Sequence, residues 1–259
     1  MEGMRRFYLP PAHIRPPFIH LTGAQAHHLL HVLRLGVGAE VEIFDGQGRS
    51  YISRIVRRSR EGVCCQVLEE RLVPPKQRGT LILGQGIPRG EKMRWIIEKA
   101  TELGVDVVIP LQTSRTVPQR DAEQMMRHQE RWQRIAQEAA RQCGRVYVPV
   151  IYPCTPWEAF LSQHPESLEE EKSGTAPEVL KLLCWEGAST PLRSLLPPQS
   201  PVHAIIFVVG PEGGFSEEEV SQAVEHGFAP VSLGPRLLRT ETVALTMLTL
   251  LQFLYGDLG

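Results

Sequence analysis

Two glycine-containing stretches near the carboxyl end decide the fold class: Val209-Gly210-Pro211-Glu212-Gly213-Gly214-Phe215-Ser216 and, about twenty residues later, Leu233-Gly234-Pro235-Arg236-Leu237-Leu238-Arg239-Thr240-Glu241-Thr242. Each follows an apolar run typical of a buried strand, at residues 203–209 and 229–233, and precedes a helical pattern. Both stretches would therefore lie at the carboxyl ends of strands, where open α/β sheets bind ligands. Because glycine lets a ligand lie directly against the backbone, we predict two ligand loops.

The first stretch also carries signals for the turn into the next helix. Pro211 restricts one backbone angle, and Ser216 with Glu219 has the spacing of a capping box. We expect the helix to bury Val220, Ala223 and Val224. Neither G-x-G-x-x-G after a first strand nor a Gly-Lys-Ser/Thr loop occurs, which argues against a nucleotide-phosphate site. A tight turn without a ligand stays the structural alternative.

The two loops resemble those of the RsmE family, SPOUT-class methyltransferases that methylate N3 of one uridine in 16S ribosomal RNA. Further similar segments occur along nearly the whole chain, at residues 4–7, 28–34 and 91–104. The chain departs from the family pattern at Arg141, where an acid is expected, and in residues 162–175, which match no family motif. Neither departure touches the two loops.

The resemblance implies a two-domain α/β protein. It predicts a small amino-terminal β-barrel domain of the PUA-like, RNA-binding type at residues 1–73, a linker at 74–79 and a parallel-sheet SPOUT domain at 80–259. In that family the carboxyl-terminal segment passes through an earlier loop and forms a trefoil knot, although knots are rare in general. The knot loops form the cofactor pocket at a homodimer interface, which would explain the apolar last helix at residues 242–255.

Composition and periodicity agree with this organisation. With 259 residues and 42% hydrophobic side chains, the chain can bury the core of one large or two modest domains. Short strands are expected at residues 40–45, 49–56 and 62–72. Beyond residue 80, strand-like runs alternate with helical patterns, which predicts a parallel sheet; the runs are 80–83, 105–110, 146–151, 179–185, 203–209 and 229–233. Gly104 is expected to end the first of these helices in a left-handed conformation.

Charge and cysteine content exclude other classes of protein. The 28 basic and 29 acidic side chains nearly cancel, so overall charge does not indicate a nucleic-acid binder. Four arginines cluster at Arg54, Arg57, Arg58 and Arg60, which fits either phosphate contact or a solvated strand edge. The five cysteines lack paired C-x-x-C spacing, so no zinc site or disulfide framework is indicated. Without a leader or an apolar run of about 18 residues, we expect a cytoplasmic protein outside the membrane.

The family resemblance also implies the site residues. The cofactor would be S-adenosyl-L-methionine, held by Trp185, Val209, Gly210, Pro211, Glu212, Gly213, Leu233, Gly234, Leu238 and Thr242. Arg239 is the expected catalytic cation, which would stabilise the anion formed when uridine N3 loses its proton. Glu241 would orient it or act as the base. As alternatives, Arg236 and Arg239 could be a surface pair, and Glu241 could only complement the dipole of the last helix.

The RNA partner is expected to be 16S rRNA in the small ribosomal subunit. The candidate contacts in the first domain are Arg5, Arg6, His28, Arg34 and Arg58. His27 and His31 have the spacing of a metal pair on a helix, but no third ligand with suitable spacing accompanies them, so no metal is predicted. The alternative function is a non-catalytic, two-domain RNA-binding ribosome assembly factor, against which the two intact ligand loops argue.

Overall fold

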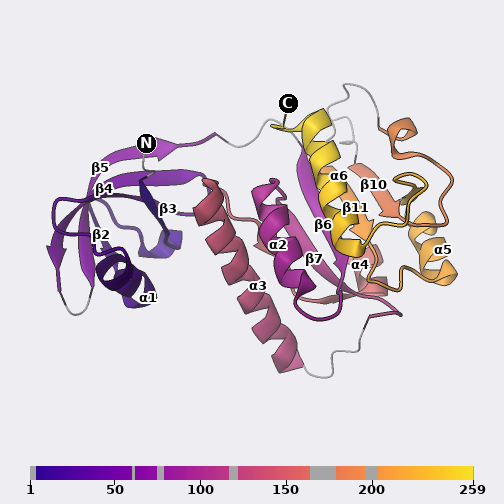
Figure 1. The fold of residues 1–259 in the computed structure, drawn as a ribbon, viewed down its shortest axis with the longest axis horizontal. Helices are drawn as coiled ribbons and strands as arrows, with labels where there is room; N and C mark the ends of the chain where they lie inside the picture. Colours follow the sequence, from indigo (N-terminus) through magenta and orange to yellow (C-terminus); the bar gives the residue numbers. More distant parts are fainter. Residues whose placement is uncertain are drawn as a thin grey trace. The chain divides into compact units, whose positions relative to one another are not determined.

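The computed structural model describes residues 4–59, 62–74, 79–116, 122–163, 179–196 and 204–258 (Figure 1). The chain forms two compact units, Met1–Pro75 with Gln137–Val148 and Lys76–Ala136 with Pro149–Gly259. The expected domain bounds at 73 and 80 stay a prediction, since most of the linker between them lies outside the described residues. Pattern reading did not anticipate that residues 137–148 belong to the first unit.

The first unit is built on a five-stranded sheet that curls into a half-barrel. Its strands follow the spatial order β1 (Arg5–Tyr8), β3 (Glu40–Phe44), β4 (Arg49–Arg58), β5 (Val63–Leu72) and β2 (Phe18–Leu21). Only the β1–β3 pair is parallel. The predicted small β domain at the amino terminus is thus confirmed, with the curled sheet as its half-barrel.

A short helical segment packs on this sheet. It consists of α1 (Gly23–His27) followed by a π-helical turn at His28–Val32, and a 3₁₀ turn at Pro11–His13 lies between β1 and β2. Leu29 of the π-helical turn is fully buried with Val41 and Ile43 of β3. These apolar contacts form the core of the first unit.

The second unit contains the predicted parallel sheet. Its spatial order is β12 (Ala229–Val231), β10 (Val179–Cys184), β11 (Ala204–Val209), β6 (Thr80–Gly86), β7 (Val107–Gln112) and β8 (Val150–Ile151), with β9 (Thr155–Pro156) also paired to β7. All these pairs are parallel. The strand expected from residue 146 begins only at Val150, because Tyr147 instead bridges to Gly46 and Gln47 of the first unit.

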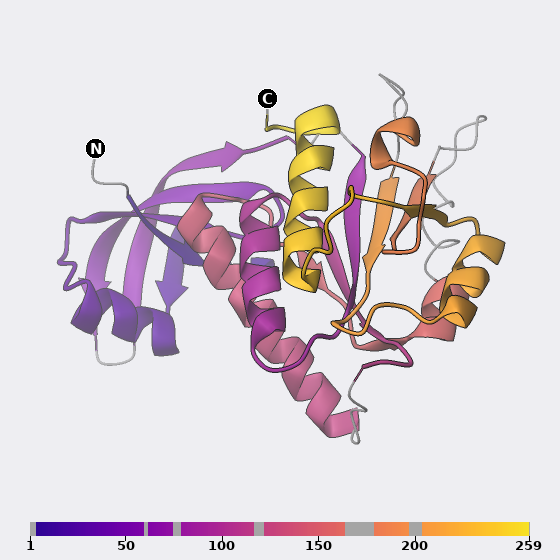
Figure 2. The same ribbon diagram turned by 45° about the vertical axis from the view of Figure 1, so that its right-hand side comes forward.

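Helices accompany this sheet in the alternation that the sequence predicted. They are α2 (Lys92–Glu102), α3 (Ala122–Cys143), α4 (Trp157–Gln163), α5 (Glu217–Glu225) and α6 (Thr240–Tyr255). Helices α2 and α6 lie side by side in both views (Figures 1 and 2). Gly104 follows α2 with a φ of 87°, which confirms the predicted left-handed position. None of the helices described is long and apolar enough to cross a membrane.

The start of α5 confirms the predicted capping box. The Ser216 hydroxyl accepts a hydrogen bond from the backbone N–H of Glu219 at 3.2 Å, and the Glu219 carboxylate accepts one from the N–H of Ser216 at 2.9 Å. The prediction for Val224 is wrong, because this side chain is 49% exposed. It lies beyond the narrow buried face that Glu219, Val220 and Ala223 form.

The trefoil knot stays a prediction. Two connections of the second unit, residues 164–178 and 197–203, lie outside the described residues, and so does most of the segment 162–175 that matched no family motif. The described elements have the sheet order given above, with α6 packed on α2 and β11.

Candidate functional site

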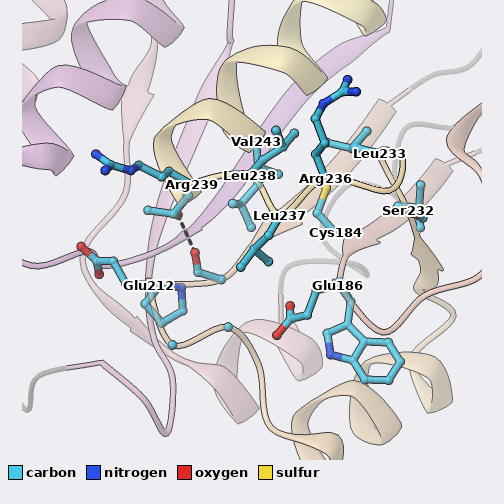
Figure 3. A pocket seen from close by; sticks show the side chains of 18 of the residues that line it. Cys184, Glu186, Glu212, Ser232, Leu233, Arg236, Leu237, Leu238, Arg239 and Val243 are labelled. Carbon is cyan, nitrogen blue, oxygen red and sulfur yellow. Dashed lines mark hydrogen bonds between the residues drawn. The ribbon is translucent and has the colours of Figure 1, made fainter.

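The two predicted ligand loops meet in one pocket of about 670 Å³ in the second unit. The pocket lies at the carboxyl ends of three adjacent parallel strands. Residues 184–186 contribute from the end of β10, 209–214 from β11 and 231–240 from β12, and Lys92 and Val243 complete the lining (Figure 3). This volume and position suit a nucleoside-sized ligand.

Thr240 joins the two loops at the back of the pocket. Its hydroxyl donates to the carbonyl oxygen of Gly210 at 2.5 Å and accepts from the side-chain amide of Gln85 at 2.9 Å. Gln85 and Thr240 are both buried, and Gln85 lies in the central strand β6. Hydrogen bonds among buried groups are costly to leave unmade, so they hold both loops to the middle of the sheet.

Two glycines meet backbone requirements of the loops. Gly214 has a φ of 68°, and a Cβ there would lie 2.7 Å from a carboxylate oxygen of Glu186. Gly234 has a φ of 111°, and a Cβ there would point into open space. Other residue types are strained at such angles. The second loop therefore presents bare backbone beside open space, a feature that suits a ligand lying on the chain.

The loop after β7 supports the first ligand loop from outside. The guanidinium of Arg115 donates a hydrogen bond to the carbonyl oxygen of Gly213. The backbone N–H of Ser114 donates to Glu219 at 2.7 Å, so the same carboxylate caps α5 and binds the neighbouring loop. Residues 210–216 are thus held by the loop after β7, by the start of α5 and by Thr240 of α6.

Glu212 is tied to the amino terminus of α2. Its carboxylate accepts from Nζ of Lys92 at 2.9 Å and from the backbone N–H of Arg89 at 3.1 Å. Burial raises the pKa of Glu212, but the hydrogen bonds from Lys92 and the backbone outweigh it and leave the pKa below its usual value. Glu212 is therefore an anion at neutral pH whose charge Lys92 balances.

The two catalytic candidates occupy different positions. Arg239 is the N-cap residue of α6 and lines the pocket, and its exposed guanidinium forms no hydrogen bond or ion pair with the described part of the chain (Figure 3). Glu241 is not among the lining residues. Its carboxylate lies 3.6 Å from Nζ of Lys92. Arg239 can thus reach a bound substrate, whereas Glu241 can act only through its neighbours.

The structure brings together nearly all the expected cofactor contacts. Those that line the pocket are Trp185, Val209, Gly210, Pro211, Glu212, Gly213, Leu233, Gly234 and Leu238. Thr242 does not line it, because α6 begins at Thr240 and the exposed Thr242 points elsewhere, while Val243 faces the pocket. Sequence reasoning assigned no site role to several other lining residues, among them Lys92, Cys184, Glu186, Leu237 and Val243.

Arg6 was expected to contact RNA, and in the structure its guanidinium binds other groups of the first unit. The guanidinium pairs with Glu42 at 2.9 Å, donates to the carbonyl oxygens of Ala140 and Arg145 at 3.1 Å each, and lies 4.6 Å from the ring centroid of Phe44. A cation at the carboxyl end of a helix satisfies carbonyls that lack helical partners. Arg6 therefore binds the end of α3, and its RNA contact stays a prediction.

The other RNA candidates are more accessible. Arg5, Arg34 and Arg58 are exposed, and His28 is half-buried with its ring edge-on to Phe7 at 6.4 Å between centroids. Their RNA contacts stay a prediction. Arg60 of the arginine cluster lies outside the described residues.

The ring centroids of His27 and His31 are 4.7 Å apart. Within the described ranges, no three His, Cys, Asp or Glu side chains gather closely enough to hold a metal ion.

Comparison with protein families gives two matches. Residues 75–252 match a family described as an RNA methyltransferase domain, and residues 21–68 match one described as an RNA methyltransferase PUA domain. A Bacillus subtilis protein named ribosomal RNA small subunit methyltransferase E is 31% identical over 245 residues, which covers 92% of this chain and 90% of that protein. A Synechocystis protein of the same name is 33% identical over 241 residues, covering 92% and 73%.

Solved structures give the same picture. A ribosomal RNA small subunit methyltransferase E from Neisseria gonorrhoeae, bound to S-adenosyl methionine, is similar with a TM-score of 0.83 and 31% identity, covering 99% of this chain and 100% of that chain. A putative methyltransferase from Legionella pneumophila, in complex with the same cofactor, has a TM-score of 0.81 and 32% identity, covering 96% and 97%.

Proposed function

Because this chain belongs to the RNA methyltransferase family that includes ribosomal RNA small subunit methyltransferase E, we propose that it transfers a methyl group from S-adenosylmethionine to the 16S RNA of the small ribosomal subunit. The observation that carries the proposal is the convergence of both glycine loops on one pocket at the carboxyl ends of β10, β11 and β12. A binding protein without a small-molecule cofactor would not need this pocket.

The residues present fit the methyl donor. The bare backbone at Gly234, together with the apolar side chains of Leu233, Leu237 and Leu238, suits a nucleoside that lies flat against the loop. Leu237 is 86% exposed, so a bound ligand would cover an apolar side chain that now faces solvent. When bound, the donor supplies a methyl group already activated by its sulfonium, which makes a metal unnecessary.

The acceptor that we infer is N3 of a uridine. This nitrogen carries a proton at neutral pH, and its loss leaves a negative charge shared with the two flanking carbonyl oxygens. The guanidinium of Arg239, which pairs with none of the described residues, can stabilise that charge, and Thr240 with Lys92 holds the first turn of α6 on which Arg239 depends. Preorganised positive charge at such a site typically lowers the activation free energy by about 3 kcal/mol.

Two further features belong to this proposal. The first unit would dock the RNA through Arg5, His28, Arg34 and Arg58. The outer face of α6 would form a homodimer interface, because Leu250, Phe253 and Leu254 are exposed there while the opposite face packs on α2 and β11. A protein that modifies ribosomal RNA works where ribosomes assemble, so we expect it in the cytoplasm.

Methyl transfer can be tested directly. The substrate is small ribosomal subunits from cells in which the gene for this chain is deleted, incubated with tritiated S-adenosylmethionine and the purified protein. We expect label in 16S rRNA and a reverse-transcription stop at one uridine, since an N3-methyl group blocks base pairing. Unlabelled RNA would favour the non-catalytic assembly factor. Label at another atom would preserve the methyltransferase and reject the N3 assignment.

A further inference from the structure

Glu186 is a pocket-lining carboxylate without a partner in the part of the chain that the structure describes. It is the second residue after β10, between the two ligand loops in the sheet order, and its carboxylate points toward the first ligand loop, away from the guanidinium groups of Arg236 and Arg239 (Figure 3). It forms no hydrogen bond or ion pair with any residue that the structure describes. Unlike Glu212, it therefore does not hold the pocket together.

The local fold fixes the direction of this side chain. The backbone N–H of Trp185 donates to Val231 at 3.3 Å, which continues the pairing of β10 with β12. The chain then turns, with the N–H of Ala188 donating to the carbonyl oxygen of Trp185 at 3.1 Å. Trp185 packs against the core cluster of the second unit. With Trp185 held in this way, the turn presents Glu186 at the pocket.

The glycine loop leaves room for the carboxylate. An oxygen of Glu186 lies 2.7 Å from the position where a Cβ of Gly214 would be, so any larger residue at 214 would displace it. Gly214 also needs its positive φ of 68°. The turn after β10 and the glycine loop after β11 together fix where the Glu186 carboxylate lies in the pocket.

No cation among the described residues forms an ion pair with Glu186, although Arg236 and Arg239 also line the pocket. Of the described residues that line the pocket, two are carboxylates, and Lys92 balances the other one, Glu212. Cys184 beside it is neutral at physiological pH, since burial raises the pKa of this thiol to about 12. The exposed Leu237 would cover a bound ligand, and removal of water strengthens any charge interaction beneath it.

We propose that Glu186 recognises the positive charge on the sulfur of the methyl donor and so makes the pocket select the charged donor over the neutral thioether product. This inference rests on the proposed function and deepens it. The attraction exists before transfer and is lost once the methyl group has left, because the product sulfur carries no charge. Glu186 therefore favours exchange of product for donor after each turnover.

Isothermal titration calorimetry on the full-length protein tests this without any catalysis. The ligands are S-adenosylmethionine, its product S-adenosylhomocysteine and sinefungin, an unreactive analogue that carries a protonated amine in place of the methylated sulfur. The variants are Glu186→Gln, which removes the charge at nearly constant shape, and Glu225→Gln, a control on the exposed part of α5 away from the pocket. We expect Glu186→Gln to weaken donor binding about tenfold, a size typical of one charge-assisted contact, and product binding by less than about twofold.

The outcomes separate the inference from the proposed function. Equal weakening of donor and product binding would overturn the inference, because Glu186 would then contact a part that both ligands share. Unchanged affinity for both ligands would overturn it too. If the Glu186→Gln variant does not fold, the wild type decides: sinefungin must bind more tightly than the product, and equal affinities reject the selection. A wild-type protein that binds none of the three ligands would instead reject the proposed cofactor.

Discussion

Arg239 is the residue on which the chemical step is expected to depend. Its guanidinium lines the pocket and has no partner in the described part of the chain, so its charge is free for the uridine anion. We expect Arg239→Ala to slow methyl transfer at least about a hundredfold while cofactor and RNA affinities stay nearly normal. Single-turnover assays with saturating enzyme measure this step, and Arg236→Ala is the control from the same loop. A wild-type rate in Arg239→Ala would reject the role.

Arg6 leads to a different expectation, about stability. Its side chain, with 12% of its surface exposed, donates to one carbonyl in the last turn of α3, to one just beyond it and to one carboxylate. Arg6→Met leaves these acceptors unpaired and should lower the free energy of unfolding by about 1–3 kcal/mol. Urea denaturation measures the loss. The exposed neighbour Arg5, replaced in the same way, should change stability by less than about 0.5 kcal/mol, and an equal effect of both changes would contradict this account.

At the scale of elements, the first turn of α6 connects the pocket to the sheet. Thr240→Val keeps the shape of the side chain but removes the donor to the carbonyl of Gly210 and one of the two acceptors of the Gln85 amide. We expect a lower melting temperature and weaker binding of S-adenosylmethionine, both visible in thermal shift assays. Thr242→Val, on the exposed side of the same turn, serves as the control. If both variants behave like the wild type, the hydroxyl bridge does not support the pocket.

The contact between α2 and the first ligand loop predicts a pH dependence. Because the pKa of Glu212 is lowered in the folded protein, its ion pair stabilises the fold above the unfolded carboxyl pKa of about 4.3, and this contribution disappears as the pH falls through the lower folded pKa. Wild-type protein and the Glu212→Gln variant should therefore differ in urea midpoint at neutral pH and converge in acid. A difference that persists at pH 3 would show that Glu212 acts through something other than its charge.

For the whole molecule, the main expectation is dimerisation through α6. Phe253 is 64% exposed on an apolar helix whose other face is buried, an arrangement that soluble monomers avoid. We expect light scattering to give twice the chain mass for the wild type and the single mass for Phe253→Glu. Val224→Glu, at an exposed apolar position of α5, should leave the dimer intact. A monomeric wild-type protein that transfers methyl groups would contradict both the proposed interface and the expectation that catalysis requires the dimer.

The sequence by itself determined the architecture of the second unit and the segments that form its pocket. Local signals identified the apolar runs of β10, β11 and β12, the left-handed Gly104 and the capping box of α5. They can be predicted from the sequence because they do not depend on contacts with distant segments. Motif resemblance added the family and most of the pocket lining, because the two glycine loops are continuous in the chain.

Only the tertiary structure decided the features that join distant segments. Arg6 donates hydrogen bonds to carbonyl oxygens at the end of a helix more than 130 residues away, which spacing cannot reveal. Residues 146–148 have a strand-like composition, yet contact with Gly46 places them in the first unit. Glu186 and Lys92 carry no motif of their own. Their positions depend on which strand ends and helix starts become neighbours, and that is settled by packing of the whole sheet rather than by local preference.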